Sequence, residues 1–166
     1  MTQAVLGLGG NIGDSRKLIA TAIHQLSAHP GINVEAVSSL YLTPPWGKID
    51  QPAFLNAAVR IDTTFSPRAL LQTILDIERR LGRERTERWG PRRIDIDILI
   101  FDAVEVDEPG LHLPHPKLQE RAFALVPLVD VMPAAEFAGR RADTWLLHLG
   151  AGGIVRLAEG EWHNPA

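Results

Sequence analysis

Two aspartates, Asp95 and Asp97, stand two residues apart at the start of a segment with a strong strand pattern. Alternate side chains of a strand leave the same face, so the α-carbons of this pair would lie about 6.5 Å apart. A divalent cation would relieve the repulsion between two such carboxylates, and two hard cations about 3.5 to 4 Å apart can hold the entering and leaving oxygens of a phosphoryl transfer. The alternative is a solvated strand face, which an isolated pair with this spacing more often represents.

The residues that follow the two acids favour a site over a plain surface. On the odd-numbered face the next side chains, Leu99 and Phe101, are apolar. The even-numbered face is apolar throughout, with isoleucine at positions 94, 96, 98 and 100. The strand is therefore apolar on both faces except at its first odd positions. This pattern predicts a polar site at its amino-terminal end.

Arginine is concentrated just before the two acids. Of the 17 basic residues, 14 are arginine, and seven of those lie between positions 79 and 93. Four of them lie in the loop between a glycine that is expected to end a helix and the strand expected to begin at position 93: Arg83, Arg85, Arg88 and Arg92. The planar guanidinium fork suits phosphate oxygens better than an ammonium group does, so this segment predicts a loop that closes over a polyphosphate. The alternative is a solvated, salt-bridged surface, because Glu84 and Glu87 are interleaved with the arginines.

A histidine between two prolines and several aromatic residues could complete a ligand site. His115 lies in the run Leu113-Pro114-His115-Pro116, where the prolines restrict the backbone and aim the imidazole, although a lone histidine is more often a surface turn residue. Four further residues could hold a flat ring, three by stacking and one by its amide: Trp46, Phe54, Phe123 and Asn56. Each aromatic residue is individually more often part of a core, and spacing alone does not bring these segments together.

The elements that must position these residues alternate between strand and helix patterns. Strand patterns cover residues 4–9, 32–42, 54–63 and 93–101, and helix patterns begin after Asp14 or Ser15 and after Ser66-Pro67. The first helix is expected to end at Pro30-Gly31, and the second to run to Leu81 before Gly82. Residues 43–47, with two adjacent prolines, predict a stiff loop. A short helix is expected over 121–131, and the tail from Pro133 carries only weak signals.

The order strand, helix, strand, strand, helix, strand is that of a split β-α-β fold. We therefore predict an α+β, ferredoxin-like architecture, with an antiparallel sheet and helices packed on one of its faces. No repeat, low-complexity tract or linker divides the chain, so residues 1–166 are expected to form one domain. This architecture carries metal binders, RNA binders and enzymes, so the fold settles no function.

Composition narrows the setting of the protein. The chain has no cysteine, which excludes a disulfide framework and a thiolate metal site. The amino terminus runs into glycines instead of a signal-peptide apolar region, which predicts a cytoplasmic protein. No apolar run approaches the roughly 20 residues that cross a bilayer, so no membrane span is expected. The formal net charge of -3 argues against general nucleic-acid binding.

Several motifs together resemble the 6-hydroxymethyl-7,8-dihydropterin pyrophosphokinase family, and they span nearly the whole chain. The two most specific are Arg88-Trp89-Gly90-Pro91-Arg92-x-Ile94-Asp95-x-Asp97-Ile98 and Pro114-His115-Pro116-x-x-x-x-Arg121-x-Phe123. The others are Gly7-Leu8-Gly9-Gly10-Asn11, Tyr41-x-Thr43-x-Pro45-x-Gly47, Gln51-Pro52-x-Phe54-x-Asn56 and Gly82-Arg83-x-Arg85.

The resemblance implies a monomeric, ferredoxin-like enzyme that uses two magnesium ions. It also implies ATP as co-substrate, from which two phosphates pass to the hydroxymethyl oxygen of the pterin, and AMP as product. By matching positions, Asp95 and Asp97 would be the metal ligands, and Arg83 and Arg92 would be mobile phosphate contacts that act in catalysis. The nucleotide site would be lined by Arg85, Trp89, Ile98, His112, His115 and Arg121. The pterin pocket would comprise Thr43, Pro45, Trp46, Phe54, Asn56 and Phe123.

Two other classes of function compete with this interpretation. A ferredoxin-like RNA-binding module could use the arginine segment, but such modules display aromatic residues in a sheet-face pattern, and this chain has one tyrosine and no such motif. A metal-dependent phosphohydrolase could use the same acids and arginines. Magnesium-dependent AMP release that requires added pterin would distinguish the transferase from both.

Overall fold

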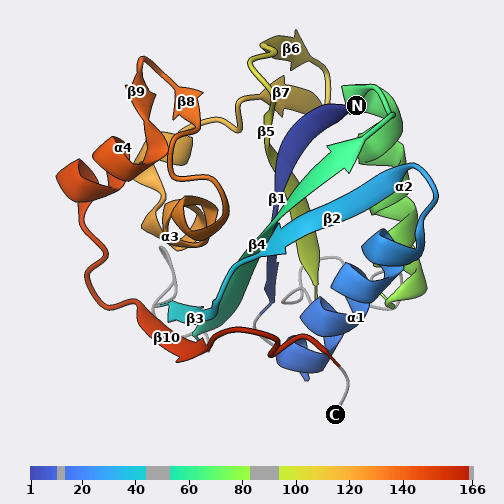
Figure 1. Ribbon diagram of the computed structural model, residues 1–166, viewed down its shortest axis with the longest axis horizontal. Helices are drawn as coiled ribbons and strands as arrows, with labels where there is room; N and C mark the ends of the chain where they lie inside the picture. Colours follow the sequence, from blue (N-terminus) through green and yellow to red (C-terminus); the bar gives the residue numbers. More distant parts are fainter. Residues whose placement is uncertain (11–13, 44–52, 83–93, 165–166) are drawn as a thin grey trace.

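A computed structural model of the chain describes residues 1–10, 14–43, 53–82 and 94–164 (Figure 1). Its first elements follow the expected order: β1 (Thr2–Gly10), α1 (Ser15–Ala28), β2 (Ile32–Val37), β3 (Leu40–Thr43), β4 (Phe54–Thr63), α2 (Pro67–Arg80) and β5 (Asp95–Phe101). After β5 come β6 (Val106–Glu108), β7 (Leu111–Leu113), a 3-10 turn η2 (Leu118–Glu120), α3 (Ala122–Val131), β8 (Glu136–Phe137), β9 (Arg140–Arg141), α4 (Ala142–Leu149) and β10 (Val155–Ala158).

The main sheet is antiparallel, in the order β10-β3-β4-β1-β5, and β2 pairs with the second half of β4. The long strands β1 and β4 pair from Thr2↔Thr63 to Gly10↔Leu55 and form its centre. The expected mixture of helices with an antiparallel sheet is confirmed. Two short hairpins, β6-β7 and β8-β9, lie outside this sheet.

The sheet has a hydrophobic core on each face. One core joins Leu6 and Leu8 of β1 to Ile23 of α1 and Ile74 of α2. The other joins Val5 and Ala58 to buried leucines of α3, and α4 packs beside α3 (Figure 1). The expectation that helices cover one face only was therefore wrong. Apolar residues run around much of α3, with only Asp130 charged, and such a helix needs burial.

Both expected helix starts are confirmed by their caps. The Asp14 side chain accepts a hydrogen bond from the Lys17 backbone N–H at 3.3 Å. The Ser66 hydroxyl accepts one from the Ala69 N–H at 3.2 Å, with Pro67 at the first helical position. Gly82 follows α2 with a φ of +97°, a conformation that suits glycine and ends the helix.

The expected strand over 32–42 is broken in the structure at Ser38 and Ser39. The backbone N–H of Ser38 still donates to the Ala58 carbonyl at 2.8 Å. In the opposite direction, the Ala58 N–H donates to the Ser38 hydroxyl at 2.8 Å, where a regular ladder would use a backbone carbonyl. Ser38 is 1% exposed, so its side chain satisfies a buried group of the sheet.

A β-bulge at Leu99 exchanges the two faces of β5. Val5 pairs with Ile100 and Leu6 with Ile98, so Leu99 is the extra residue. The isoleucines at 94, 96 and 98 lie in the core with α1 and α2, as expected, but Ile100 lies in the core with α3. Phe101 changes sides in the opposite direction. The expected single face of four isoleucines was therefore wrong at its last position.

The weakly signalled tail contributes an edge strand to the main sheet. Strand β10 pairs with β3 through Val155↔Leu42, Arg156↔Tyr41 and Ala158↔Leu40. Beyond it, the indole N–H of Trp162 donates to the Ser38 carbonyl at 2.8 Å. Among the described residues, no helix combines the length and the apolar character that crossing a bilayer requires.

Candidate active site

The two predicted acids lie on the sheet face that α3 also covers. Asp95 pairs with Gly9 of β1, and Asp97 with Gly7. Ile96, between them, is buried in the opposite core, so both carboxylates leave the α3 face. Asp95 is half-buried and Asp97 is exposed. The strand thus places two hard oxygen ligands side by side at a point that solvent reaches.

Asn56 reaches toward these acids across the central strand. It pairs directly with Gly9, and a Cβ on Gly9 would stand 2.6 Å from its amide oxygen. Its amide nitrogen donates to the hydroxyl of Thr43, a buried residue, at 2.7 Å. The missing side chain of Gly9 therefore lets the Asn56 amide lie over β1, and Thr43 fixes its orientation. A fixed amide presents one donor and one acceptor edge to a ligand.

The segment that carries His115 is held against β5. The His115 N–H donates to the carbonyl of Leu99 at 2.8 Å. Its imidazole Nδ1 lies 3.1 Å from the carbonyl oxygen of Pro116, and the Leu118 N–H donates to the His115 carbonyl. The backbone of His115 is therefore tied to the bulge residue, two positions beyond Asp97.

Two further predicted residues lie at the amino-terminal end of α3. Arg121 occupies the position before the helix and Phe123 lies in its first turn, both half-buried. Phe54 is also half-buried, at the start of β4 and opposite Thr43. The structure thus brings Thr43, Phe54, Asn56 and the two acids onto one sheet face, and α3 packs on that face.

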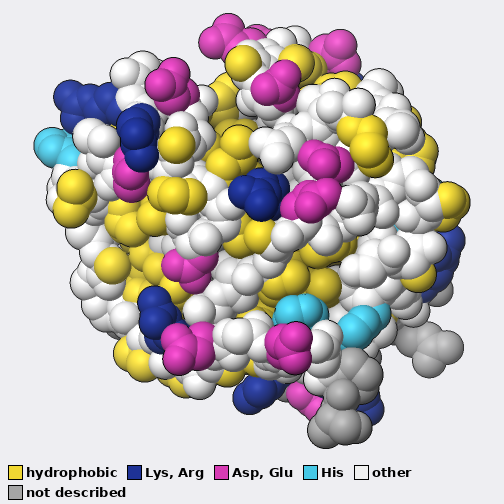
Figure 2. Space-filling model, in the orientation of Figure 1, with side chains coloured by type: hydrophobic (Ala, Val, Ile, Leu, Met, Phe, Trp, Pro, Cys, Tyr) yellow, Lys and Arg dark blue, Asp and Glu magenta, His cyan; other side chains and the backbone are white. Residues whose placement is uncertain are grey.

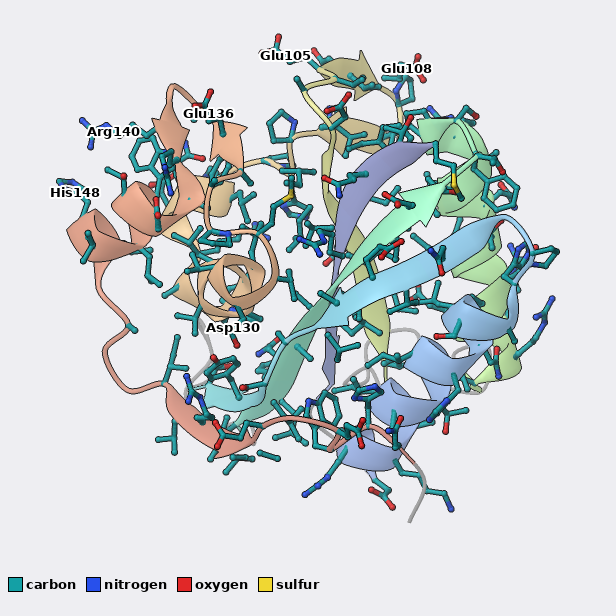
Figure 3. All side chains as sticks on the ribbon, in the orientation of Figure 1. Glu105, Glu108, Asp130, Glu136, Arg140 and His148 are labelled. Atoms are coloured by element: carbon teal, nitrogen blue, oxygen red, sulfur yellow. The ribbon has the colours of Figure 1, made fainter. Side chains whose placement is uncertain are left out.

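Two other predicted residues are not gathered there. The side chain of Ile98 is 5% exposed and faces the core of α1 and α2, away from the acids. His112 lies on the β6-β7 hairpin, where its Nδ1 is 2.8 Å from the Asp107 carboxylate. Acidic side chains gather over this hairpin (Figure 2), including Glu105 and Glu108 (Figure 3). Arg68 also lies beside this hairpin, where its guanidinium pairs with Glu108 at 2.9 Å.

Several predicted residues lie outside the described part of the chain: Pro45, Trp46, Arg83, Arg85, Trp89 and Arg92. Within the described residues, no cluster of three or more histidine or acidic side chains could hold a metal by itself. Asp95 and Asp97 nevertheless fit magnesium, which is bound through one or two carboxylates plus water and substrate phosphates. The donor set therefore suits a metal that arrives with a nucleotide.

Sequence reasoning assigned no role to three residues beside this site. The Tyr41 hydroxyl donates to the Asp130 carboxylate of α3 at 2.5 Å, and the Ser39 N–H donates to the same oxygen at 3.1 Å. Arg156 of β10 lies opposite Tyr41. Burial raises the pKa of Tyr41, and Asp130 raises it further. Tyr41 stood in a quoted motif, but no sequence signal linked it to the other two.

Comparison with known proteins gives concordant matches. The model of a family described as 7,8-dihydro-6-hydroxymethylpterin-pyrophosphokinase (HPPK) matches residues 5–133. A Methylorubrum extorquens protein named 2-amino-4-hydroxy-6-hydroxymethyldihydropteridine pyrophosphokinase is 50% identical over 157 residues, covering 95% of this chain and 99% of that protein. A Pseudomonas aeruginosa protein of the same name is 40% identical over 159 residues, covering 95% and 98%.

The structural comparison concerns the fold. A crystal structure of Plasmodium falciparum HPPK-DHPS superposes with a TM-score of 0.67 at 18% identity. The match covers 89% of this chain and 43% of that one, so this chain spans less than half of the solved chain. The likeness agrees with the expected α+β, ferredoxin-like architecture.

Proposed function

Because this chain belongs to the 7,8-dihydro-6-hydroxymethylpterin-pyrophosphokinase family, we propose that it transfers diphosphate from ATP to the hydroxymethyl group of 6-hydroxymethyl-7,8-dihydropterin, a step of folate biosynthesis. The pterin oxygen forms a bond to the β-phosphorus of ATP. The bond between that phosphorus and the α-phosphate oxygen breaks, AMP leaves, and the hydroxyl proton is lost. The observation that carries the proposal is the pair of carboxylates on the same sheet face as the fixed Asn56 amide.

Asp95 and Asp97 would hold magnesium, and we assign two ions to them. A magnesium ion bound there would supply charge neutralisation for the phosphates and polarisation of the pterin hydroxyl oxygen. The half-buried Asp95 lies next to Gly9 in the row that contains Asn56, whereas the exposed Asp97 lies nearer Leu99. Asp95 is therefore the acid closer to the heterocycle, and Asp97 the acid closer to the segment of His115.

Asn56 would recognise the edge of the pterin ring. Its Nδ2 is occupied by Thr43 at 2.7 Å, so the amide cannot rotate without losing that bond. The remaining amide edge matches a ring that presents both donors and acceptors. The ring faces would be contacted by Phe54, Phe123, Pro45 and Trp46. The fixed amide would then determine the specificity for pterin, and the apolar contacts would supply most of its affinity.

The nucleotide would approach from the other end of the acids. His115 and Arg121 lie in the segment tied to β5 at Leu99 and at the start of α3. We assign them to ATP, together with Arg83, Arg85, Trp89 and Arg92. His112 would be a further contact, and Ile98 would contribute only through its backbone, because its side chain faces the core of α1 and α2. No side chain of these motifs is assigned as a general base. Positioning and charge stabilisation would supply most of the acceleration, as they commonly do in phosphoryl transfer.

One assay tests the proposal. The purified chain is incubated with ATP and magnesium, with and without 6-hydroxymethyl-7,8-dihydropterin, and AMP is measured. We expect AMP only when pterin and magnesium are both present. AMP or phosphate released without pterin would point to a phosphohydrolase, and no nucleotide turnover under any condition would point to a binding module. In sedimentation, the same preparation should behave as a monomer. We also propose that the protein is cytoplasmic.

A further inference from the structure

The row of residues that contains Asn56 and Asp95 continues to the far edge of the sheet. Asn56 pairs with Tyr41 of β3, and Tyr41 pairs with Arg156 of β10. Arg156, Tyr41, Asn56, Gly9 and Asp95 thus stand one on each of the five successive strands. Directly paired residues project from the same face, so the side chains of Arg156, Tyr41 and Asn56 are successive neighbours, and Gly9 alone separates Asn56 from Asp95. The row joins a predicted metal ligand to the carboxy-terminal strand.

Tyr41 is fixed on several sides within this row. It is 4% exposed, and its hydroxyl donates to Asp130, which projects from α3 toward β3 (Figure 3). Asp130 is held in turn by the Ser39 N–H. Arg156 stands directly opposite Tyr41 on the neighbouring strand β10, and its guanidinium is paired with Glu159 at 3.1 Å. The phenol therefore has a hydrogen-bond partner from α3 and a cationic residue opposite it on β10.

The position of Tyr41 bears directly on Asn56. Side chains of paired residues lie about 4.5–5.5 Å apart at their β-carbons, so the Tyr41 ring borders the Asn56 amide on the side away from Gly9. On the other side the residue paired with Asn56 is Gly9, which has no side chain. A shift of the ring would thus be transmitted to the amide and to its bond with Thr43. Within the row, Tyr41 is the only residue between Arg156 and Asn56.

We propose that Arg156 is a positioning residue for the pterin pocket, acting through Tyr41 on Asn56. The inference rests on the function proposed above. It assigns a functional role to a residue after position 133, beyond the part of the chain that the family model matches. As a surface ion pair with Glu159 alone, Arg156 would contribute little. Its place opposite a buried phenol that borders the predicted ligand contact gives it a specific role.

Steady-state kinetics of Arg156→Ala test the proposal, with Arg141→Ala as the matched control. The two arginine side chains are 55% and 52% exposed, each pairs with one carboxylate, and both lie after α3. We expect Arg156→Ala to raise the KM for pterin about three- to tenfold, a free-energy change on the scale of one hydrogen bond. Its kcat and its KM for ATP should stay within about twofold of wild type. Arg141→Ala should change none of these values.

Two further variants separate positioning from folding. Arg156→Lys keeps a cation beside the phenol and should recover most of the pterin affinity. Tyr41→Phe should raise the KM for pterin, and Arg156→Ala should add little to it in the double variant, because both act through the same contact. A merely structural role would lower the melting temperature and the active fraction without this pattern.

A spectroscopic readout is independent of catalysis. Tyr41 is the only tyrosine of the chain, so phenolate absorbance reports its titration alone. Arg156 holds down the otherwise raised pKa of Tyr41, so Arg156→Ala should move the titration to higher pH. An unchanged KM for pterin in Arg156→Ala, or equal increases in the KM values for pterin and ATP, would overturn this inference. The proposed function would remain supported if the wild-type protein still forms AMP with pterin. Wild-type protein that forms no AMP with pterin would overturn both proposals.

Discussion

Gly9 has no side chain, and the amide oxygen of Asn56 lies 2.6 Å from the point where a Cβ would stand. A real Cβ cannot occupy that position, so Gly9→Ala should displace the amide and disturb its 2.7 Å bond to Thr43. We expect the KM for pterin to rise about tenfold or more, with a loss of roughly 1–3 kcal/mol in unfolding free energy.

The control for Gly9 is Gly152→Ala, where nothing lies within 4 Å of the added atom. It should leave the kinetics and the denaturation midpoint unchanged. Wild-type affinity for pterin in Gly9→Ala would mean that Asn56 does not hold the ring.

Asp97 offers a test of the metal site that does not disturb the core. Its side chain is exposed, so Asp97→Ala should leave the thermal unfolding transition close to that of wild type. Loss of a metal ligand removes several kcal/mol of charge stabilisation, so turnover should fall about 1,000-fold or more. Pterin-dependent AMP formation measures this loss, and near-normal turnover would refute the metal assignment.

At the level of single residues, the sequence predicted those that stand in compact motifs. Asp95 with Asp97, and Phe54 with Asn56, could be proposed because short spacing on a strand determines which side chains share a face. Thr43 was expected only from the family resemblance. The Tyr41, Asp130 and Arg156 contacts could not be predicted, because they join β3, α3 and β10. Each of these residues alone has the pattern of an ordinary surface or core residue.

The break between β2 and β3 gives a prediction at the scale of elements. The Ser38 hydroxyl accepts from the Ala58 N–H at 2.8 Å and donates to the Ser39 carbonyl at 2.7 Å. Ser38→Ala would leave a buried N–H without its partner, which costs about 1–3 kcal/mol in unfolding free energy. Denaturant titration measures the loss.

Ser39→Ala is the matched control, because the contacts of Ser39 described above use its backbone. Its midpoint should stay within experimental error of wild type. Equal stability of the two variants would show that water replaces the Ser38 hydroxyl at this break.

Most elements were predictable because their signals are local. The bounds of β4 agree with the expected strand over 54–63, and the caps at Asp14 and Ser66 were read directly. The bulge at Leu99 and the break at Ser38 were missed, because each exists only through its pairing with β1 or β4. The face covered by α3 was missed because an apolar helix has no polar side to indicate its orientation.

At the scale of the whole molecule, the segment after β10 is fastened to α1. His24 Nε2 lies 2.8 Å from the His163 carbonyl oxygen, and the Trp162 ring packs edge-on against the His163 ring. Burial lowers the pKa of His163 and the neighbouring His24 lowers it further, while Glu161 acts in the opposite direction. The folded state therefore binds a proton at His163 less readily than the unfolded state does.

The lowered pKa of His163 predicts an acid-sensitive contribution to the unfolding free energy. This contribution should be fully present above the ordinary histidine pKa of 6.5, and it should be lost as the pH falls from that value through the lowered pKa of the folded state. Unfolding free energies measured from neutral to mildly acidic pH should fall less steeply in His163→Asn than in wild type. Parallel curves for the two proteins would contradict the prediction.

The place of β10 in the chain has a consequence for biosynthesis. Its partner β3 is made early, whereas β10 leaves the ribosome only after α4 has been translated. Until then, the free side of β3 presents unpaired backbone groups to any strand nearby, including one from another nascent chain. Slow translation or scarce chaperones at that moment should therefore reduce the yield of soluble protein, even if the finished molecule is stable.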